Sequence, residues 1–136
     1  MTMSDKKVLT EKLYGEMSQN GDIDTLVDTY FTEDFVEHEE VPGLEATGRD
    51  VPKMMFRMMR QGMPDIRAEV DFMLEEGDRV VAYGNFVGTH TGDFMGMPGS
   101  GNAVKIPFTD ILEWRDGQIA GHWGVSDMSA VFAPAG

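Results

Sequence analysis

Residues 66–90 have the sequence IRAEVDFMLEEGDRVVAYGNFVGTH, in which the spacing of apolar residues changes from helical to every second position. Its first half predicts a half-buried strand whose inner face carries Ile66, Ala68, Val70, Phe72 and Leu74. Residues 76–78 (EGD) then turn the chain, and residues 79–90 return as a second long strand. This stretch therefore predicts an antiparallel hairpin with one buried face.

A second hairpin is predicted beyond a glycine-rich loop, residues 91–102 (TGDFMGMPGSGN). That loop lacks the GxxxxGK and GxGxxG spacings of phosphate-binding loops, so we interpret it as a turn or lid. Strands are expected over residues 104–114 and 119–128, joined by a turn at Asp116-Gly117.

The residues before these hairpins have helical spacing. A helix is predicted over residues 4–19, capped by Ser4 and stopped by Asn20-Gly21. A second helix follows Asp22 or Asp24, with an apolar stripe made of Ile23, Leu26, Val27, Tyr30 and Phe31.

A short strand is then expected over residues 35–41, ended by Pro42-Gly43, and a third helix over residues 48–61 with Pro52 in its first turn. The predicted inner face of this helix consists of Val51, Met55, Met58 and Gly62. Its methionine cluster either lines a soft pocket wall or is core, and we expect core for at least two of Met54, Met55, Met58, Met59 and Met63.

Helices followed by long hairpins are typical of an α+β domain with helices on one face of an antiparallel sheet. Strands of this length twist and curl, so the sheet should wrap around a cavity, and a curled sheet plugged by helices makes a cone with one open mouth. A length of 136 residues predicts a single domain over residues 1–136.

The composition excludes several classes of partner and chemistry. Eleven basic residues against 24 acidic ones give a net charge of −13, which repels nucleic acid and anionic membranes. The absence of cysteine excludes thiolate nucleophiles and thiolate metal sites. Because the apolar runs are short and MTMSDKK (residues 1–7) lacks the apolar stretch of a signal peptide, we expect a cytoplasmic protein.

Asp110 interrupts the apolar face of the third predicted strand. A desolvated carboxyl is typical of a general acid or base, although a carboxyl near an open end of the sheet or one capping a backbone donor fits the same pattern.

His122 is the natural partner of Asp110, and the turn between their strands decides whether they meet. If Asp116-Gly117 is a two-residue turn, His122 falls opposite Ile111 and points to the other face. If residues 115–117 form a three-residue loop with Gly117 left-handed, Asp110 and His122 pair directly on one face.

Two other histidines are candidates. His90 ends a strand beside the glycine-rich loop, where a catalytic role and a structural hydrogen bond are equally compatible with the pattern. His38 stands among Glu37, Glu39 and Glu40, where it either serves the site or belongs to a solvated acidic edge. Since HEEV (residues 38–41) lacks the second histidine of HExxH, no metal is expected.

Three stretches match one known family: GTHTGDFMGMP (residues 88–98), FTDILEWRDGQIAGHWGVSD (108–127), and PDIRAEV (64–70) followed by EEGDRVV. From about Phe35 onward the chain resembles the SnoaL-like polyketide cyclases, or ester cyclases, of the nuclear-transport-factor-2-like superfamily. The resemblance implies a cone-shaped α+β barrel with a deep apolar pocket, and commonly a homodimer packed through the sheet faces. It also implies that Asp110 and His122 face inward, which favours the three-residue loop.

One position departs from that family. The aromatic-polyketide cyclases use an aspartate two residues after the matching histidine, where this chain has Gly124, and Asp110 stands at the position of their pocket histidine. The polar residue types are therefore rearranged.

The resulting hypothesis is a cofactor-independent enzyme that transfers protons on a small hydrophobic carbonyl compound or lactone, by aldol-type cyclisation or isomerisation. Its expected catalytic residues are Asp110, His122 and His90, and its expected substrate-binding residues are His38, Tyr14, Trp123, Met55, Phe108 and Phe94. The alternatives are a hydrolase that activates water on an epoxide or ester, a non-catalytic module that binds a hydrophobic ligand, and a purely structural dimerisation domain.

Overall fold

The computed structural model describes residues 4–18, 21–40 and 43–132. Its elements in chain order are α1 (Asp5–Met17), α2 (Ile23–Tyr30), β1 (Phe31–Glu37), α3 (Asp50–Gly62), β2 (Arg67–Glu76), β3 (Arg79–Thr89), β4 (Ala103–Arg115), β5 (Gln118–Ser126) and α4 (Ser129–Phe132). The predicted α+β class is confirmed. None of these helices is both long enough and apolar enough to span a membrane.

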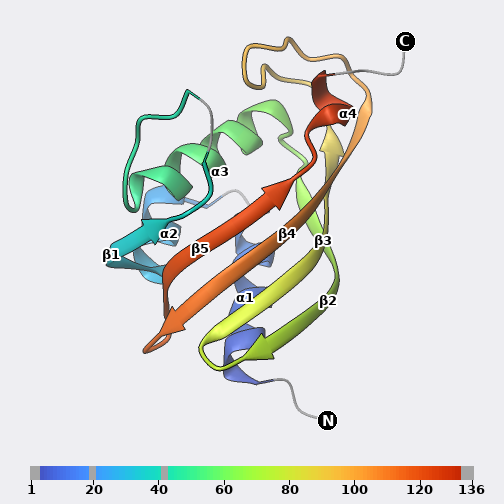
Figure 1. Cartoon of the computed structure of the whole chain (residues 1–136). Coiled ribbons are helices and arrows are strands. Elements are labelled where there is room, and N and C mark those ends of the chain that lie inside the picture. The colour runs from blue at the N-terminus through green and yellow to red at the C-terminus, as the bar shows by residue number, and fades with distance from the viewer. Residues whose placement is uncertain (1–3, 19–20, 41–42, 133–136) are drawn as a thin grey trace.

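The strands form one curled sheet in the order β1-β5-β4-β3-β2, which does not close into a full barrel (Figure 1). Helices α1, α2 and α3 lie together on one face of this sheet. Strands β2 to β5 pair antiparallel, as predicted. Strand β1 instead pairs parallel with β5, because helix α2 delivers the chain to the sheet edge in that direction.

The two N-terminal helices begin where their capping residues predict. The Ser4 hydroxyl accepts a hydrogen bond from the Lys7 amide, and the Asp22 carboxylate accepts one from the Thr25 amide. Residues 19–20, which include the predicted stop at Asn20, lie outside the described residues. The Arg60 guanidinium of α3 donates to three backbone carbonyls at the end of α1 and the connection after it, and so ties this helix pair to α3.

Strand β1 begins at Phe31, four residues before the start of the predicted strand, and ends at Glu37. Phe31 was expected in the helical stripe, and it is indeed buried, but its backbone is extended. Its amide still donates to the carbonyl of Val27, so this residue closes the helix and opens the strand at once. The predicted end of the strand at Val41 lies outside the described residues.

Helix α3 buries Met59 where the spacing predicts Met58. Met59 continues the i+4 row from Val51 through Met55 to Met63, and this row faces the sheet. Met59 and Met63 are core residues, in line with the expectation for this cluster.

The predicted inner face of strand β2 is wrong for the residues that follow Asp71. The pairing with β3 shifts at Asp71, and this β-bulge exchanges the faces of the residues that follow. Phe72 and Leu74 therefore point to the outer face, where 51% and 59% of their surfaces are exposed, and Met73 turns inward. Phe72 stacks on Tyr83 of β3, with ring centroids 5.4 Å apart.

The core fills the space between the concave face of the sheet and the helices. Its fully or almost fully buried members come from every layer and include Leu13, Val27, Phe35, Val80, Ile106, Phe108, Leu112 and Ile119. One part of this space is not filled, and polar side chains converge there.

Candidate active site

Asp116 and Gly117 form a two-residue turn between β4 and β5. Both have positive φ values, 51° and 81°, as a type I′ turn requires. Arg115 and Gln118 pair directly across this turn. The three-residue loop favoured by the family resemblance is therefore wrong.

A β-bulge at Ala120 nevertheless brings the two predicted residues to one face. Ala120 has no partner on β4, because the pairing shifts by one residue at this point. His122 consequently lies opposite Leu112 rather than Ile111, and it points to the inner face together with Asp110. The structure thus combines a two-residue turn with an inward-pointing His122. From the sequence, an inward His122 was expected only with a three-residue loop.

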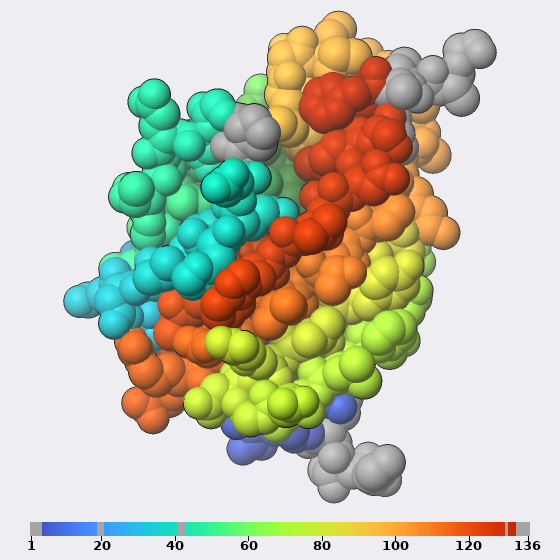
Figure 2. Space-filling model, viewed as in Figure 1, coloured from blue at the N-terminus to red at the C-terminus, as the bar shows by residue number. Residues whose placement is uncertain are grey.

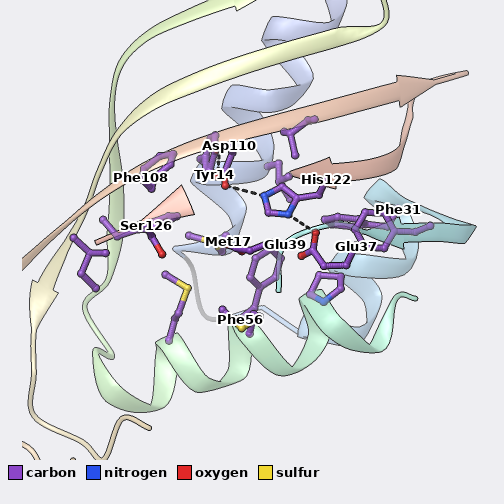
Figure 3. A pocket seen from close by; sticks show the side chains of 18 of the residues that line it. Tyr14, Met17, Phe31, Glu37, Glu39, Phe56, Phe108, Asp110, His122 and Ser126 are labelled. Carbon is purple, nitrogen blue, oxygen red and sulfur yellow. Dashed lines mark hydrogen bonds and ion pairs between the residues drawn. The ribbon is translucent and has the colours of Figure 1, made fainter. Parts of the chain in front are cut away.

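A chain of hydrogen bonds runs along the inner face of the sheet (Figure 3). The hydroxyl of Tyr14 donates to Oδ2 of Asp110 over 2.6 Å. Oδ1 of Asp110 lies 2.8 Å from Nε2 of His122. Nδ1 of the same ring lies 2.5 Å from Oε2 of Glu37. The chain therefore links α1, β4, β5 and β1.

These contacts determine the charge of the histidine. Burial by itself would lower the pKa of His122, but the hydrogen bonds to Asp110 and Glu37, and the charges of these carboxylates, raise it to about 10. The ring is therefore an imidazolium at neutral pH and donates from both nitrogens. Burial, together with the charge and hydrogen bond of Asp110, raises the pKa of Tyr14 well above its ordinary value, so its hydroxyl remains a donor.

Gly124 makes room for the imidazolium. It lies directly opposite Asp110 on the neighbouring strand. A Cβ atom at Gly124 would stand 2.8 Å from Cε1 of His122, closer than real Cβ atoms approach, and 3.0 Å from Oδ1 of Asp110, tighter than most real Cβ contacts. The glycine that departs from the family pattern is therefore the residue that permits the pairing of His122 with Asp110.

The hydrogen-bonded chain borders a cavity of about 100 Å³. Its walls are mostly apolar and are supplied by α1, α3 and the sheet, including Leu13, Met17, Phe35, Met55, Phe56 and Phe108. In Figure 2 the surface is hollowed between β1 and the end of β5. Glu39 and Ser126 are among the residues that line the cavity. Small-molecule sites commonly measure 300–1,000 Å³, so this cavity suits a small apolar group.

Two acidic residues of this cavity, Glu37 and Glu39, were treated in the sequence only as neighbours of His38. The side chain of Glu37 is 11% exposed, and its residue pairs with His122 across the parallel strands. The alternation that starts from the buried Phe35 is the signal that could have found them, because residues 35, 37 and 39 share one face of an extended chain.

Glu39 is half-buried and faces the same cavity. Desolvation is the largest influence on the pKa of Glu39 and raises it. The charge of His122 lowers this pKa, whereas the charges of Asp110 and Glu37 raise it. On balance the pKa of Glu39 is raised.

The other predicted site residues divide into two groups. Tyr14, Met55 and Phe108 line the cavity with Asp110 and His122. The remaining four are not among its lining residues, and they form two pairs elsewhere: His38 with Trp123, and His90 with Phe94.

The first of these pairs lies on the outer face of the sheet. The rings of His38 and Trp123 stack with centroids 4.3 Å apart, and the Arg79 guanidinium lies 4.7 Å from the centroid of the same indole. The second pair is buried beside the glycine-rich loop, with centroids 6.4 Å apart.

Glu37, Glu39 and His122 also have the spacing of a metal site, since one ligand-type atom of each lies within 4.8 Å of the others. Both nitrogens of His122, however, face carboxylate oxygens. A ring that donates from both nitrogens offers no lone pair to a metal ion, so this arrangement fits an imidazolium better than a metal.

Comparison with known proteins gives a family and a fold. The family model for the SnoaL-like polyketide cyclases matches residues 8–134. A solved structure described as a SnoaL-like polyketide cyclase from Jannaschia sp. CCS1 is 24% identical, with a TM-score of 0.80 over 98% of this chain and 99% of that chain. IdmH from Streptomyces antibioticus, described as a polyketide cyclase, is 24% identical, with a TM-score of 0.81 over 96% of this chain and 97% of that chain.

A third solved structure is AclR from Streptomyces galilaeus, described as a hydroxylase. It is 26% identical, with a TM-score of 0.78 over 93% of this chain and 78% of that chain. Among curated proteins, none matches this chain.

Proposed function

Since the chain belongs to the SnoaL-like polyketide cyclase family, we propose that it is a cofactor-independent acid/base enzyme for a small hydrophobic carbonyl compound or lactone. The proposed reaction is an aldol-type cyclisation or an isomerisation, and both begin with removal of a proton next to a carbonyl group. The observation that supports this proposal is the His122 imidazolium, which is held between Asp110 and Glu37 on the wall of a mostly apolar cavity.

In this proposal His122 carries the positive charge that stabilises the oxyanion of an enolate. Asp110 orients the ring, and Tyr14 holds Asp110 in turn, while the Nδ1–H of His122 leaves Glu37 to donate to the oxyanion. Met55 and Phe108 contact the apolar part of the ligand. The residue pairs outside the cavity have no part in this proposal.

The test is turnover of a panel of β-keto esters, lactones and epoxides by the wild-type protein and by Asp110→Asn. Glu113→Gln is the matched control, because Glu113 lies on the same strand but pairs with Arg79 on the outer face. Turnover of a keto ester or lactone that Asp110→Asn loses and Glu113→Gln keeps would support the proposal. Turnover of epoxides or simple esters alone would favour the water-activating hydrolase.

One observation favours a second candidate function, a module that binds a hydrophobic ligand without converting it. Both oxygens of Asp110 and both ring nitrogens of His122 already have partners within the protein. In such a module these groups only satisfy one another, and Asp110→Asn reduces stability while ligand binding remains. Binding of a hydrophobic ligand without turnover in the panel would establish this alternative.

We further propose that the protein is a homodimer whose subunits pack through the outer face of the sheet. Two cross-strand rows supply an apolar surface there. The first contains Phe72, Tyr83, Thr109 and Val125, and the second contains Leu74, Val81, Ile111 and Trp123. An exposed apolar surface of this kind is typical of a protein interface.

We also propose that the protein is cytoplasmic and that its ligand is a small hydrophobic molecule. The net charge of −13 supports the absence of nucleic-acid and anionic membrane partners.

A further inference from the structure

Proton removal next to a carbonyl group requires a base as well as an acid, and His122 is already protonated at neutral pH. We propose that Glu39 is the catalytic base, the group that takes the proton from the carbon next to the carbonyl of the ligand. This inference rests on the proposed function and assigns the base that the proposed reaction requires.

The Glu39 carboxylate is available to a ligand. Asp110 uses one oxygen for Tyr14 and the other for His122, and Glu37 uses one oxygen for the same ring. No hydrogen bond or ion pair within residues 4–18, 21–40 and 43–132 engages the Glu39 carboxylate. Glu39 therefore differs from Asp110 and Glu37 in that neither of its carboxylate oxygens is engaged by another described residue, so its whole carboxylate can turn to a ligand.

The Glu39 carboxylate lies close to His122 and to Glu37. One carboxylate oxygen of Glu39 lies within 4.8 Å of both a His122 nitrogen and a Glu37 oxygen. A ligand that lies against both Glu39 and His122 can therefore have a carboxylate near its C–H bond and a positive charge near its carbonyl oxygen. Figure 3 shows Glu39 beside Glu37, on the same cavity as His122.

Glu39 also lies along the path that a ligand would take. Glu39 lines the inner cavity and also a wider groove outside it, which is formed by the end of β1 and residues 44–51. A ligand longer than the inner cavity would pass this carboxylate, with its reacting end inside and the remainder in the groove.

The surroundings of Glu39 also increase the basicity of its carboxylate. Desolvation, with the charges of Asp110 and Glu37, raises the pKa of Glu39 against the opposing effect of His122. A carboxylate with a raised pKa holds an abstracted proton more strongly than an exposed one, which brings it closer to the range where general bases work best.

The proposed step balances without another reactant. The Glu39 carboxylate takes the α-proton, the C–H electron pair forms the C=C bond of the enolate, and the carbonyl electron pair moves to the oxygen near His122. In an isomerisation the Glu39 carboxylic acid returns the proton to another carbon of the enolate. In a cyclisation the enolate carbon bonds to a second carbonyl carbon of the same molecule, and the proton goes to the alkoxide formed there.

The experiment is hydrogen–deuterium exchange at the α-carbons of cyclohexanone and γ-butyrolactone in D₂O, followed by proton NMR. Wild type should accelerate exchange above buffer, and Glu39→Gln should reduce the enzyme-catalysed rate by about 100-fold or more, the usual size of a general-base effect. Affinity for the probe, measured by NMR titration of the protein, should change little. Glu33→Gln is the matched control, because Glu33 is an exposed carboxylate of β1 that lines neither the inner cavity nor the groove.

A second variant, Glu39→Asp, keeps the carboxylate and should retain part of the exchange even if Glu39→Gln folds poorly. The wild-type rate should also rise with pH as Glu39 ionises, and this limb should be missing from Glu39→Gln. Wild-type exchange that Glu39→Gln preserves would overturn the role of Glu39 while leaving the proposed function intact. Binding of both probes without exchange by the wild type would overturn the proposed function, and the role of Glu39 with it.

Discussion

Nε2 of His122 lies 2.8 Å from Oδ1 of Asp110, twelve residues earlier in the chain, although a turn of only two residues joins their strands. A regular hairpin with this turn would place the two side chains on opposite faces of the sheet. The unpaired Ala120 reverses the alternation of β5 after the turn and creates the pair. The site therefore depends on one irregular residue in a strand whose pairing with β4 is otherwise regular.

The coupling of this pair predicts the titration of His122. In Asp110→Asn the ring loses a charged hydrogen-bond partner, so the pKa of His122 should fall from about 10 toward its ordinary value of 6.5. An NMR titration of the imidazole signals measures this shift. Glu113→Gln, which removes a charge from the outer face of the same strand, should leave the His122 titration in place. Equal titration curves in wild type and Asp110→Asn would contradict the pairing.

The same raised pKa predicts how stability depends on pH. The folded state binds the His122 proton more tightly than the unfolded chain, so the stabilisation is fully present below pH 6.5. It should then decline as the pH rises toward about 10, where the folded state also loses this proton. Urea unfolding between pH 6 and 10 measures the decline, which should be shallower in Asp110→Asn. A free energy of unfolding that stays constant across this range would contradict the charged pair.

Gly124→Ala should disrupt the site from the opposite strand. Its new methyl group would lie within 3.0 Å of His122 and Asp110, so the imidazolium must move, at a cost of about 1–3 kcal/mol in the free energy of unfolding. Gly121→Ala is the matched control, because the nearest atoms to its Cβ are 3.6 Å away, an ordinary contact. Urea unfolding and the His122 titration test both variants. Equal effects of the two substitutions would show that Gly124 has no special role.

The proposed dimer predicts a charge-sensitive outer face. Val125 is 75% exposed, and Val125→Arg places a charge within the apolar rows of the sheet. We expect the dimer dissociation constant to rise tenfold or more, equivalent to about 1.4 kcal/mol, as measured by analytical ultracentrifugation. Val8→Arg makes the same change at an exposed position on α1 and should have no effect. A monomeric wild type would refute the proposed interface.

Local signals in the sequence were sufficient for most of the fold. Ser4 and Asp22 cap the helices they were expected to cap, and Gly77 and Gly117 adopt the positive φ values that their turns require. Such features depend on residues a few positions apart, so a single chain contains the information. The family was also recognisable, because its motifs are continuous stretches.

Errors arose where one residue changes the alternation of a strand. The bulge at Asp71 exposes Phe72 and Leu74, and the bulge at Ala120 turns His122 inward. The extra residue in a bulge has no distinctive side chain in either case, since the misalignment is a property of two paired strands.

The sequence by itself therefore determined most of the elements, the α+β class, the family and the place of Asp110 on the inner face of the sheet, because local propensity and periodicity encode them. Only the tertiary structure decided that the two predicted residues Tyr14 and His122 reach that carboxyl, and that Glu37 joins them. Tyr14, Glu37 and His122 come from three other elements, and Gly124 leaves the space in which they meet. Pairing across strands and packing of helix on sheet bring these residues within hydrogen-bonding distance, and contacts between distant segments leave no periodic trace in the sequence.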